Sequence, residues 1–441
     1  MASCSRHIWD GEFFLLLTAA GMEEVKQEVD DISLEFVKTL IQKDIGEDEI
    51  EVKNFRTERA TEAGDNFSTV IYRITANYNK DPKIEKTCEA VYIGKFLPVQ
   101  PKQRELVQQI MTFDREVVVY NDLIPAMVNL QKEKLGRDSI LVPNVPQCIY
   151  ANGKSTPIAA VIMEDLFRKG FRLADKYQGL QPDEVRLLME AYGRYHGLGV
   201  FVDRHSDFSS RPIFRDNPFE TIPEFHDMMR SCLNSVCKVL EEIPGQEENA
   251  RKMKDYVVKV DGGRERLFEF IGRKGKLLTF LHGDCWCNNM MFRYDPDTGA
   301  PVEIKIFDLQ IVAYGNPCRD LMHVFYSSTS KETRKQKSAF LKLYHDTLIS
   351  TTNNLGVVLS YSYEDFLKEI EDHEEFGFLV AMFIIPVILA EKEDIPDYTK
   401  TDLDVDEFIR LREQQLFTRG SSVIKQRLVD IVERMVEIGV F

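Results

Sequence analysis

The spacing of apolar residues changes along the chain, and this change constrains the fold more than any other feature. In the first third apolar and polar positions alternate, as in Phe67–Tyr78, where Val70, Tyr72 and Ile74 share one face. From Gln181 onward the apolar residues recur every three to four positions. Alternation indicates strands, and the longer spacing indicates helices. We therefore expect a β-rich part followed by a mainly helical part.

The β-rich part is predicted to hold a small sheet and one long helix. That helix is expected from about 103 to 123 and should end before Pro125. Asn152-Gly153 favours a tight turn and predicts a hairpin. A hinge is expected near 163–166, where the helical part begins. The expected strands are 50–55, 67–78, 87–97, 147–150 and 157–163.

The helical part is predicted to be interrupted by one short hairpin. Its strands are Met290–Tyr294 and Val302–Phe307, joined by the turn sequence Asp-Pro-Asp-Thr-Gly. We expect three domains: an N-terminal extension with a helix (1–48), a nucleotide-binding sheet and helix (49–165), and a helical lobe (166–441). The later helices are expected at 331–351, 363–370, 376–390 and 406–438.

Charge and cysteine content exclude several classes of protein. The formal net charge is −16, and no basic block offsets it, which argues against a nucleic-acid partner. Eight cysteines in 441 residues are too few for a disulfide scaffold and lack paired zinc-site spacing. The apolar run Phe376–Ala390 contains Pro386 and is too short to span a membrane. Acidic residues precede the apolar run Phe13–Met22, so no secretory signal is expected and the location is predicted to be cytoplasmic.

The most informative motif is a His-x-Asp-x-x-x-x-Asn sequence, formed by His282, Asp284 and Asn289, with Asp308 following 19 residues after Asn289. This is the layout of a phosphoryl-transfer site. One carboxylate, Asp284, would orient the acceptor hydroxyl and take its proton. An amide oxygen and a second carboxylate, from Asn289 and Asp308, would hold Mg²⁺ against the triphosphate of ATP. The hairpin between them is expected to bring Asn289 and Asp308 to the same metal.

The β-rich part contains candidates for the nucleotide partners. Lys95 ends an apolar strand, on the face of Val91 and Ile93, and could reach the α- and β-phosphates. Its expected counter-ion is Glu116, although Asp114 and Glu105 are nearby rivals. An ordinary surface lysine remains an alternative for Lys95.

Two further segments are candidate nucleotide contacts. Asn66, Phe67 and Ser68 follow Gly64 in a turn that could cover the phosphates through backbone N–H groups and a hydroxyl. The turn lacks a GxGxxG fingerprint. Met163 and Glu164 follow a strand and could pair with adenine edges through their backbone. An ordinary connection between lobes explains this second segment nearly as well.

Together these motifs resemble the ecdysteroid kinase-like (CHK kinase-like) family. The resemblance rests on the run from His282 to Phe292, the later Asp-x-Gln at Asp308, the Met-Glu-Asp-Leu segment and Asn66-Phe67-Ser68. It covers about residues 30–420. It implies an α+β, protein-kinase-like fold with a small β-rich N-lobe and a large mainly helical C-lobe. It also implies phosphorylation of a small-molecule hydroxyl that depends on ATP and Mg²⁺, as in the related choline and aminoglycoside kinases.

The resemblance also implies a role for each matching residue. Asp284 is expected to be the catalytic base, Asn289 and Asp308 the Mg²⁺ ligands, Lys95 the phosphate lysine and Glu116 its partner. His282 is expected to brace the catalytic loop. Two positions depart from the family pattern: Leu309 follows the metal Asp in place of Phe, and Gly94 precedes Lys95 where a β-branched residue is usual.

The sequence leaves two rival functions and the identity of the acceptor open. A protein kinase would carry Lys at the position of Trp286 and a long activation segment. A catalytically inactive nucleotide-binding scaffold is the second rival. Apolar residues, namely Trp286, Phe325, Tyr326 and the run from Phe376, favour a neutral hydrophobic alcohol such as an ecdysteroid over a cationic acceptor.

Overall fold

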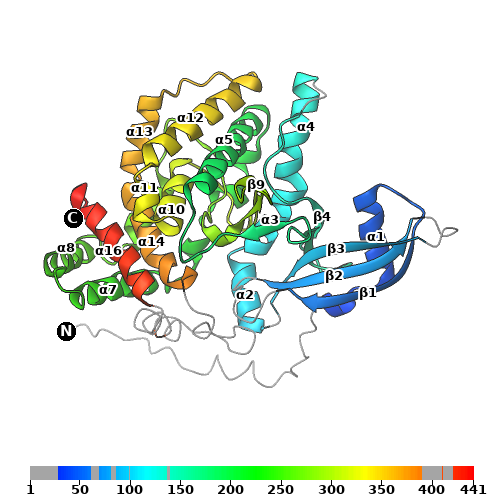
Figure 1. The fold of residues 1–441 in the computed structure, drawn as a ribbon, viewed down its shortest axis with the longest axis horizontal. Helices are drawn as coiled ribbons and strands as arrows, with labels where there is room; N and C mark the ends of the chain where they lie inside the picture. The colour runs from blue at the N-terminus through cyan, green and yellow to red at the C-terminus, as the bar shows by residue number, and fades with distance from the viewer. Residues whose placement is uncertain are drawn as a thin grey trace, which may run out of the picture.

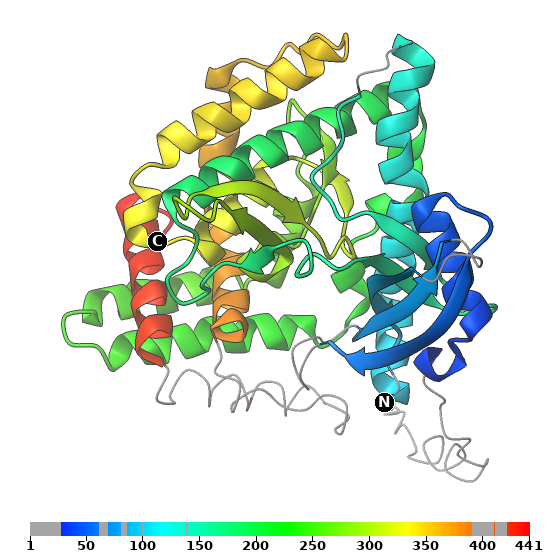
Figure 2. The same ribbon diagram turned by 45° about the vertical axis from the view of Figure 1, so that its right-hand side comes forward.

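The computed structural model describes residues 28–60, 69–80, 86–98, 100–136, 140–389, 410 and 421–441. Figure 1 shows an antiparallel sheet with helix α1 (Leu34–Ile45) at one end of the molecule, and a larger, mainly helical part at the other. Figure 2, turned by 45°, shows the same separation. The fold is therefore α+β and kinase-like, as the sequence predicts.

The N-terminal sheet has five strands in the order β1-β2-β3-β5-β4, and each strand is antiparallel to its neighbours. Helix α1 begins after Ser33, whose side chain accepts a hydrogen bond from Phe36 N–H, and it ends at the left-handed Gly46. Its buried side chains pack against one face of the sheet. The strands are β1 (Glu51–Arg59), β2 (Val70–Asn79), β3 (Thr87–Phe96), β4 (Cys148–Asn152) and β5 (Ala160–Glu164).

Gly94 does not loosen strand β3. It pairs with Tyr72 on one side and Ile162 on the other, without a break in register. A Cβ atom at Gly94 would lie 2.7 Å from a ring carbon of Phe96, so the aromatic ring occupies the space that a side chain would need. The glycine therefore lets Phe96 lie flat over the strand.

The single helix predicted over 103–123 is wrong. Helix α2 (Pro101–Gln109) ends near Met111, which has a left-handed φ of 55°, and α3 (Thr112–Val118) starts afresh. A π-helical turn, η2 (Val119–Leu123), then leads into α4 (Ile124–Leu135). Pro125 does not end the helical run, which continues from the π-helical turn η2 into the first turn of α4, where Pro125 lies.

The helical part is built around α5 (Pro182–His205). Its apolar face is buried throughout, as the spacing from Val185 to Tyr195 predicts, and it packs against α12 (Lys337–Asn354). The other helices of eight or more residues here are α7 (Phe225–Glu241), α8 (Glu247–Lys259), α9 (Arg264–Gly272), α10 (Cys318–Ser328), α13 (Tyr363–Asp372), α14 (Glu374–Ile388) and α16 (Ser421–Glu437).

Of the later predicted helices, one is divided in the structure, one is confirmed and one is described only in part. The helix expected over 331–351 is divided into α11 (Lys331–Arg334) and α12. Helix α14 confirms the apolar helix near 376–390 and packs its buried side against α10. The last predicted helix is described only from residue 421 onward; its earlier part lies outside the described residues.

Two small sheets lie within the helical part. One has the order β6-β8-β9, with β6 (Phe171–Leu173), β8 (Met290–Tyr294) and β9 (Pro301–Ile306). The other pairs β7 (Thr279–Leu281) with β10 (Ala313–Gly315). The predicted 290–307 hairpin is thus confirmed as β8 and β9.

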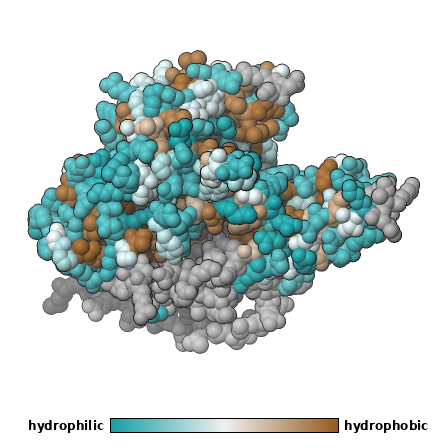
Figure 3. All heavy atoms as spheres, in the orientation of Figure 1, coloured by the Kyte–Doolittle hydropathy of each residue, from teal (hydrophilic) through white to brown (hydrophobic). Residues whose placement is uncertain are grey.

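The surface and the helices give no sign of a membrane-spanning segment in the described part of the chain. On the face drawn in Figure 3, hydrophilic residues predominate and hydrophobic ones form small patches. None of the helices described combines the length and the apolar character needed to cross a membrane.

Candidate active site

The β8–β9 hairpin brings Asn289 and Asp308 to the same end of a ladder. Met290 pairs with Ile306, and Phe307 N–H donates to the Asn289 carbonyl at 3.0 Å. Asn289 therefore lies opposite Phe307, and Asp308 is the next residue along the chain. Asp308 has a left-handed φ of 65°, which turns the chain away from the strand direction directly after the ladder.

Asp284 lies in the loop that precedes this hairpin. Asn289 Nδ2 donates to the Asp284 carboxylate at 2.9 Å and to its backbone carbonyl at 3.0 Å. Burial and the charge of Asp308 raise the pKa of Asp284 to about 7, although the hydrogen bond from Asn289 and the charge of Lys95 lower it in part. The indole Nε1 of Trp286 is buried without a well-formed hydrogen bond, yet it lies close enough to Asp284 to lower this pKa.

The loop itself requires glycine at position 283. Gly283 has a φ of 87°, and a Cβ atom there would lie 2.3 Å from the Ile311 carbonyl oxygen. Only glycine accepts both conditions. The loop is thereby packed directly against the chain that follows Asp308.

Lys95 lies between two carboxylates. Its Nζ donates to both oxygens of Glu116, at 2.8 and 2.9 Å, and also contacts Asp308. Lys95 is buried, and burial alone would lower its pKa; the charges of Asp308 and Glu116 outweigh this and raise it. Lys95 is thus a buried cation that joins the sheet, helix α3 and the β8–β9 hairpin, rather than a surface lysine.

Glu116, and not its sequence neighbour Asp114, contacts Lys95. Asp114 lies beside Gly153, where an added Cβ atom would come within 2.6 Å of its carboxylate. Arg115, between these two residues, is buried and donates to the backbone carbonyls of Val312 and Asp216 at 3.4 and 3.3 Å. Helix α3 is therefore tied to Lys95 on one side and to the chain after Asp308 on the other.

Met163 and Glu164 lie at the end of strand β5, where the chain leaves the sheet. Met163 pairs with Ile93 and Glu164 with Tyr92. The Glu164 side chain accepts from Gln147 N–H at 2.8 Å and forms an ion pair with Lys169. The Glu164 side chain is thus engaged in the structure of the connection, and so is its backbone N–H, which donates to the Gln147 carbonyl at 3.0 Å.

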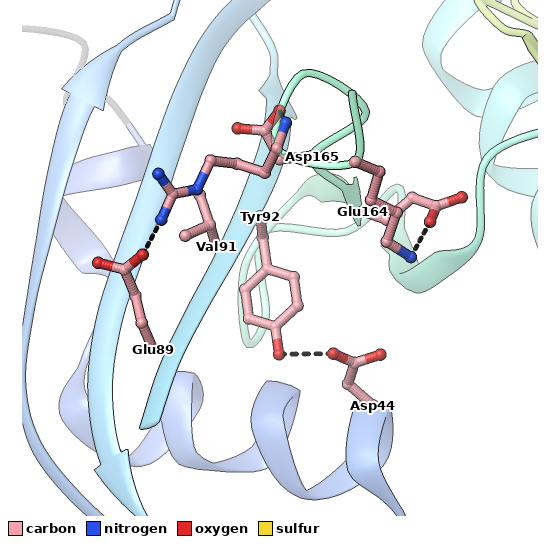
Figure 4. Close-up of a pocket in the computed structure, with 8 residues that line it drawn as sticks. Asp44, Glu89, Val91, Tyr92, Glu164 and Asp165 are labelled. Atoms are coloured by element: carbon pink, nitrogen blue, oxygen red, sulfur yellow. Dashed lines mark hydrogen bonds and ion pairs between the residues drawn. The ribbon is translucent and has the colours of Figure 1, made fainter. Parts of the chain in front are cut away.

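The same connection is anchored to the sheet by charged side chains. Asp165, whose side chain is fully buried, accepts from Arg73 Nε on β2 at 2.8 Å. Figure 4 shows the small pocket beside it. In this pocket the Tyr92 hydroxyl donates to Asp44 at 3.0 Å, and Arg168 forms an ion pair with Glu89. These pairs fix where the connection runs.

A small apolar cluster lies next to this connection, and sequence reasoning missed it. Leu166, Phe171 and Met291 are buried together, with Phe307 packed against them, and they form a unit separate from the main core. Phe171 and Leu173 on β6 pair with Arg293 and Met291 on β8. The only sequence signal was the apolar character of three short segments far apart in the chain.

Asp320, on helix α10, was also missed as a site residue. Its carboxylate accepts from the backbone N–H groups of His282 and Gly283, at 2.7 and 3.0 Å, and lies 3.1 Å from His196 Nε2. Burial alone would raise the Asp320 pKa, but these hydrogen bonds and the nearby histidines lower it. A fully buried carboxylate therefore holds the loop that carries Asp284.

His282 braces the loop from within. Its Nε2 lies 2.8 Å from the Phe307 carbonyl oxygen, and its Nδ1 accepts from Asp284 N–H at 3.2 Å. The ring consequently links the Asp284 loop to the end of the hairpin. This geometry matches the bracing position expected for His282.

The donor set at Asn289 and Asp308 fits a hard cation. Both N–H groups of the Asn289 side chain are used by Asp284, so its amide oxygen is left for another partner. Within the described residues, no group of three or more His, Cys, Asp or Glu side chains is arranged so that it could hold a metal ion. Mg²⁺ does not need such a cage, since it is bound through one or two protein oxygens together with phosphates and water.

Not every predicted site residue can be placed. The structure brings five of them together through the contacts given above: Lys95, Glu116, Asp284, Asn289 and Asp308. Three predicted nucleotide contacts lie outside the described residues, namely Asn66, Phe67 and Ser68.

A small antiparallel sheet joined to a helical part, with a buried lysine, two aspartates and an asparagine between them, defines a protein of the kinase-like class. Residues 63–357 match the model of the Ecdysteroid kinase-like family. The match covers more than half of the chain, so the chain belongs to that family. Comparison with curated proteins gives no match. Family membership places the chain among kinase-like phosphotransferases that act on small molecules.

Proposed function

We propose that this protein transfers the γ-phosphoryl group of ATP to a hydroxyl group of a small molecule. The observation that carries the proposal is the position of Lys95, a buried cation in contact with both Glu116 and Asp308. A buried lysine held by a helix carboxylate, beside a hairpin aspartate, is what a triphosphate site requires. Apolar residues of similar size can replace a buried ion pair with little or no loss of stability, so the fold alone does not require a lysine here.

Each site residue has a role in this proposal. Lys95 binds the α- and β-phosphates, and Glu116 holds the lysine in place. Asp284 orients the acceptor hydroxyl and receives its proton. Asn289 and Asp308 would hold Mg²⁺, which when bound neutralises charge on the phosphates.

The nucleotide base would lie against the apolar cluster of Leu166, Phe171 and Met291. Apolar side chains suit the faces of a purine ring, and the backbone at Met163 and Glu164 would supply its hydrogen bonds. The Arg73–Asp165 pair supports this arrangement, because it fixes the connection from which that backbone comes.

For the acceptor we propose a neutral hydrophobic alcohol, with an ecdysteroid as the leading case. Family membership supports this choice, and so does the half-buried Trp286 two residues from Asp284. Phe325 and Tyr326 do not support it, since both lie in the main core, where the Tyr326 hydroxyl donates to Glu374. Helix α14 is mostly buried too, but Val380, Ile384 and Val387 remain partly exposed along one side.

A panel of acceptors tests both parts of the proposal. The protein would be incubated with Mg·ATP and, in separate reactions, ecdysone, choline, an aminoglycoside, a nucleoside and a peptide mixture, and mass spectrometry would detect new phosphate esters. We expect an ester of the steroid. Preference for choline or the aminoglycoside would contradict the neutral acceptor, phosphorylated peptides would indicate a protein kinase, and ATP binding without any ester would favour an inactive scaffold.

A further inference from the structure

Side chains of helix α10 accept hydrogen bonds from a series of backbone N–H groups in the loop around Asp284. Asp320 accepts from His282 and Gly283 N–H, as described above. One turn further along α10, His323 Nδ1 accepts from Cys285 N–H at 3.2 Å. At the end of the helix, Ser328 Oγ accepts from Cys287 N–H at 2.9 Å.

His323 lies at the centre of this series and holds the backbone directly after Asp284, at the Cys285 N–H group. Burial outweighs the charge of Asp320, which alone would raise the His323 pKa, and lowers this pKa to about 4. The ring is therefore neutral near pH 7, as an acceptor of the Cys285 N–H group must be.

We propose that His323 is a positioning residue, which orients the Asp284 carboxylate by holding the backbone of the next residue, Cys285. The proposal rests on the proposed phosphotransfer function, in which Asp284 must face the acceptor hydroxyl. Asp284 cannot be held from its solvent side, where the acceptor would enter. Asn289 Nδ2 holds the carboxylate itself, at 2.9 Å. The backbone that follows Asp284 is a second place to control its direction, and His323 holds that backbone at the Cys285 N–H group.

The arrangement explains an otherwise costly feature. His323 Nε2 is buried and has no hydrogen-bond partner. An unpaired buried polar atom costs about 1–3 kcal/mol, and an apolar residue at this position would avoid that cost. What an apolar residue could not do is accept the Cys285 N–H group, which would then itself be left buried without a partner.

Three variants separate positioning from general support of the fold. His323→Leu removes the acceptor, whereas His323→Asn keeps an amide oxygen near the place of Nδ1. His373→Leu is the matched control: His373 is likewise buried, with an unpartnered Nε2, but its Nδ1 bonds to the Glu369 carbonyl in α13, away from the loop.

Amide hydrogen exchange of peptides covering 282–289 reads the loop directly and needs no substrate. We expect His323→Leu to exchange there about 10-fold faster than the unaltered protein, while His323→Asn and His373→Leu stay close to it. In the ecdysone assay, His323→Leu should lower kcat by about 10²-fold with little change in KM for ATP, as misplacement of a reacting group does. His373→Leu should lower the melting temperature but not kcat.

The two readouts distinguish failure of this inference from failure of the proposed function. Unchanged exchange in His323→Leu, or an equal increase in His373→Leu, would overturn the inference whatever the activity. Faster exchange with an unchanged kcat would also overturn it. If His323→Leu does not fold, His323→Asn decides. Exchange at 282–289 about 10-fold faster than in the unaltered protein, or a kcat about 10²-fold lower, would then contradict the role of the acceptor atom. Absence of any phosphotransfer by the unaltered protein would overturn the function alone.

Discussion

The Lys95 ammonium group donates to both carboxylate oxygens of Glu116, at 2.8 and 2.9 Å, although the two residues come from different elements, strand β3 and helix α3. Both side chains are buried. Their pairing holds the helix at a fixed place relative to the sheet. Since Lys95 also contacts Asp308, three segments of the chain meet at one charged group.

The first prediction concerns Lys95. Lys95→Met should weaken ATP binding by about 10-fold or more, because a charge-assisted contact to phosphate is worth about 1.5–3 kcal/mol. Isothermal titration with Mg·ATP would measure it. Lys86→Met, which removes an exposed lysine just before the same strand, is the control and should bind ATP normally. Equal losses in both variants would mean that overall charge, and not the position of Lys95, governs binding.

The second prediction concerns Asp284. Asp284→Asn should lower kcat by about 10²- to 10⁴-fold, the usual contribution of a positioned general base, and should change ATP affinity only a few-fold. Asp295→Asn, in the turn of the β8–β9 hairpin, should keep normal turnover. Steady-state kinetics of ADP formation would compare the three proteins. Near-normal turnover in Asp284→Asn would remove this residue from the chemistry.

The third prediction concerns Asp308 and the metal. Asp308→Asn should weaken binding of Mg·ATP more than binding of ATP in the presence of EDTA, because a hard cation prefers a carboxylate oxygen. Titrations with and without Mg²⁺ would measure the two affinities. An equal loss in both conditions would indicate that Asp308 acts only through its contact with Lys95.

The hairpin and the charged cluster could be predicted from the sequence because their signals are local. The turn sequence at 295–299 identifies the β8–β9 hairpin, and the ladder then fixes the proximity of Asn289 and Asp308. Strand alternation places Lys95 on an inward face. Each of these inferences needs only a short window of residues.

The features that the sequence did not predict depend on contacts between segments far apart in the chain. No residue near Met111 indicates a left-handed conformation, so the sequence predicts one helix where the structure has α2 and α3. Asp320 and His323 hold backbone groups about 38 residues away, and a backbone partner leaves no mark in the sequence. From the sequence Phe325 and Tyr326 are predicted to line a pocket, but in the structure both are buried beneath α14 and its neighbours.

The fourth prediction concerns Asp320 and pH. Its folded-state pKa is held below the usual range, so the carboxylate stabilises the fold fully above the unfolded pKa of about 3.9 and loses this effect as pH falls further. Asp320→Asn should lower the free energy of unfolding by about 3 kcal/mol at pH 7, and by less as the pH falls below about 4.

Urea denaturation at pH 7, 5, 4 and 3 would measure this difference. Asp346→Asn, which removes one partner of an exposed ion pair with Lys342, is the control and should cost about 0–1 kcal/mol at every pH. A difference between Asp320→Asn and the unaltered protein that stays constant from pH 7 to pH 3 would show that Asp320 does not act through its charge.

The most direct test of the central claim is to follow the γ-phosphate itself. ATP labelled at that phosphate would be incubated with Mg²⁺, ecdysone and either the unaltered protein or Asp284→Asn, and the label would be traced to its product. Transfer to the steroid hydroxyl, matched by an equal amount of ADP and abolished in Asp284→Asn, is the predicted result. ATP that stays intact with every alcohol offered, while still binding at Lys95, would contradict phosphotransfer as the function of this protein.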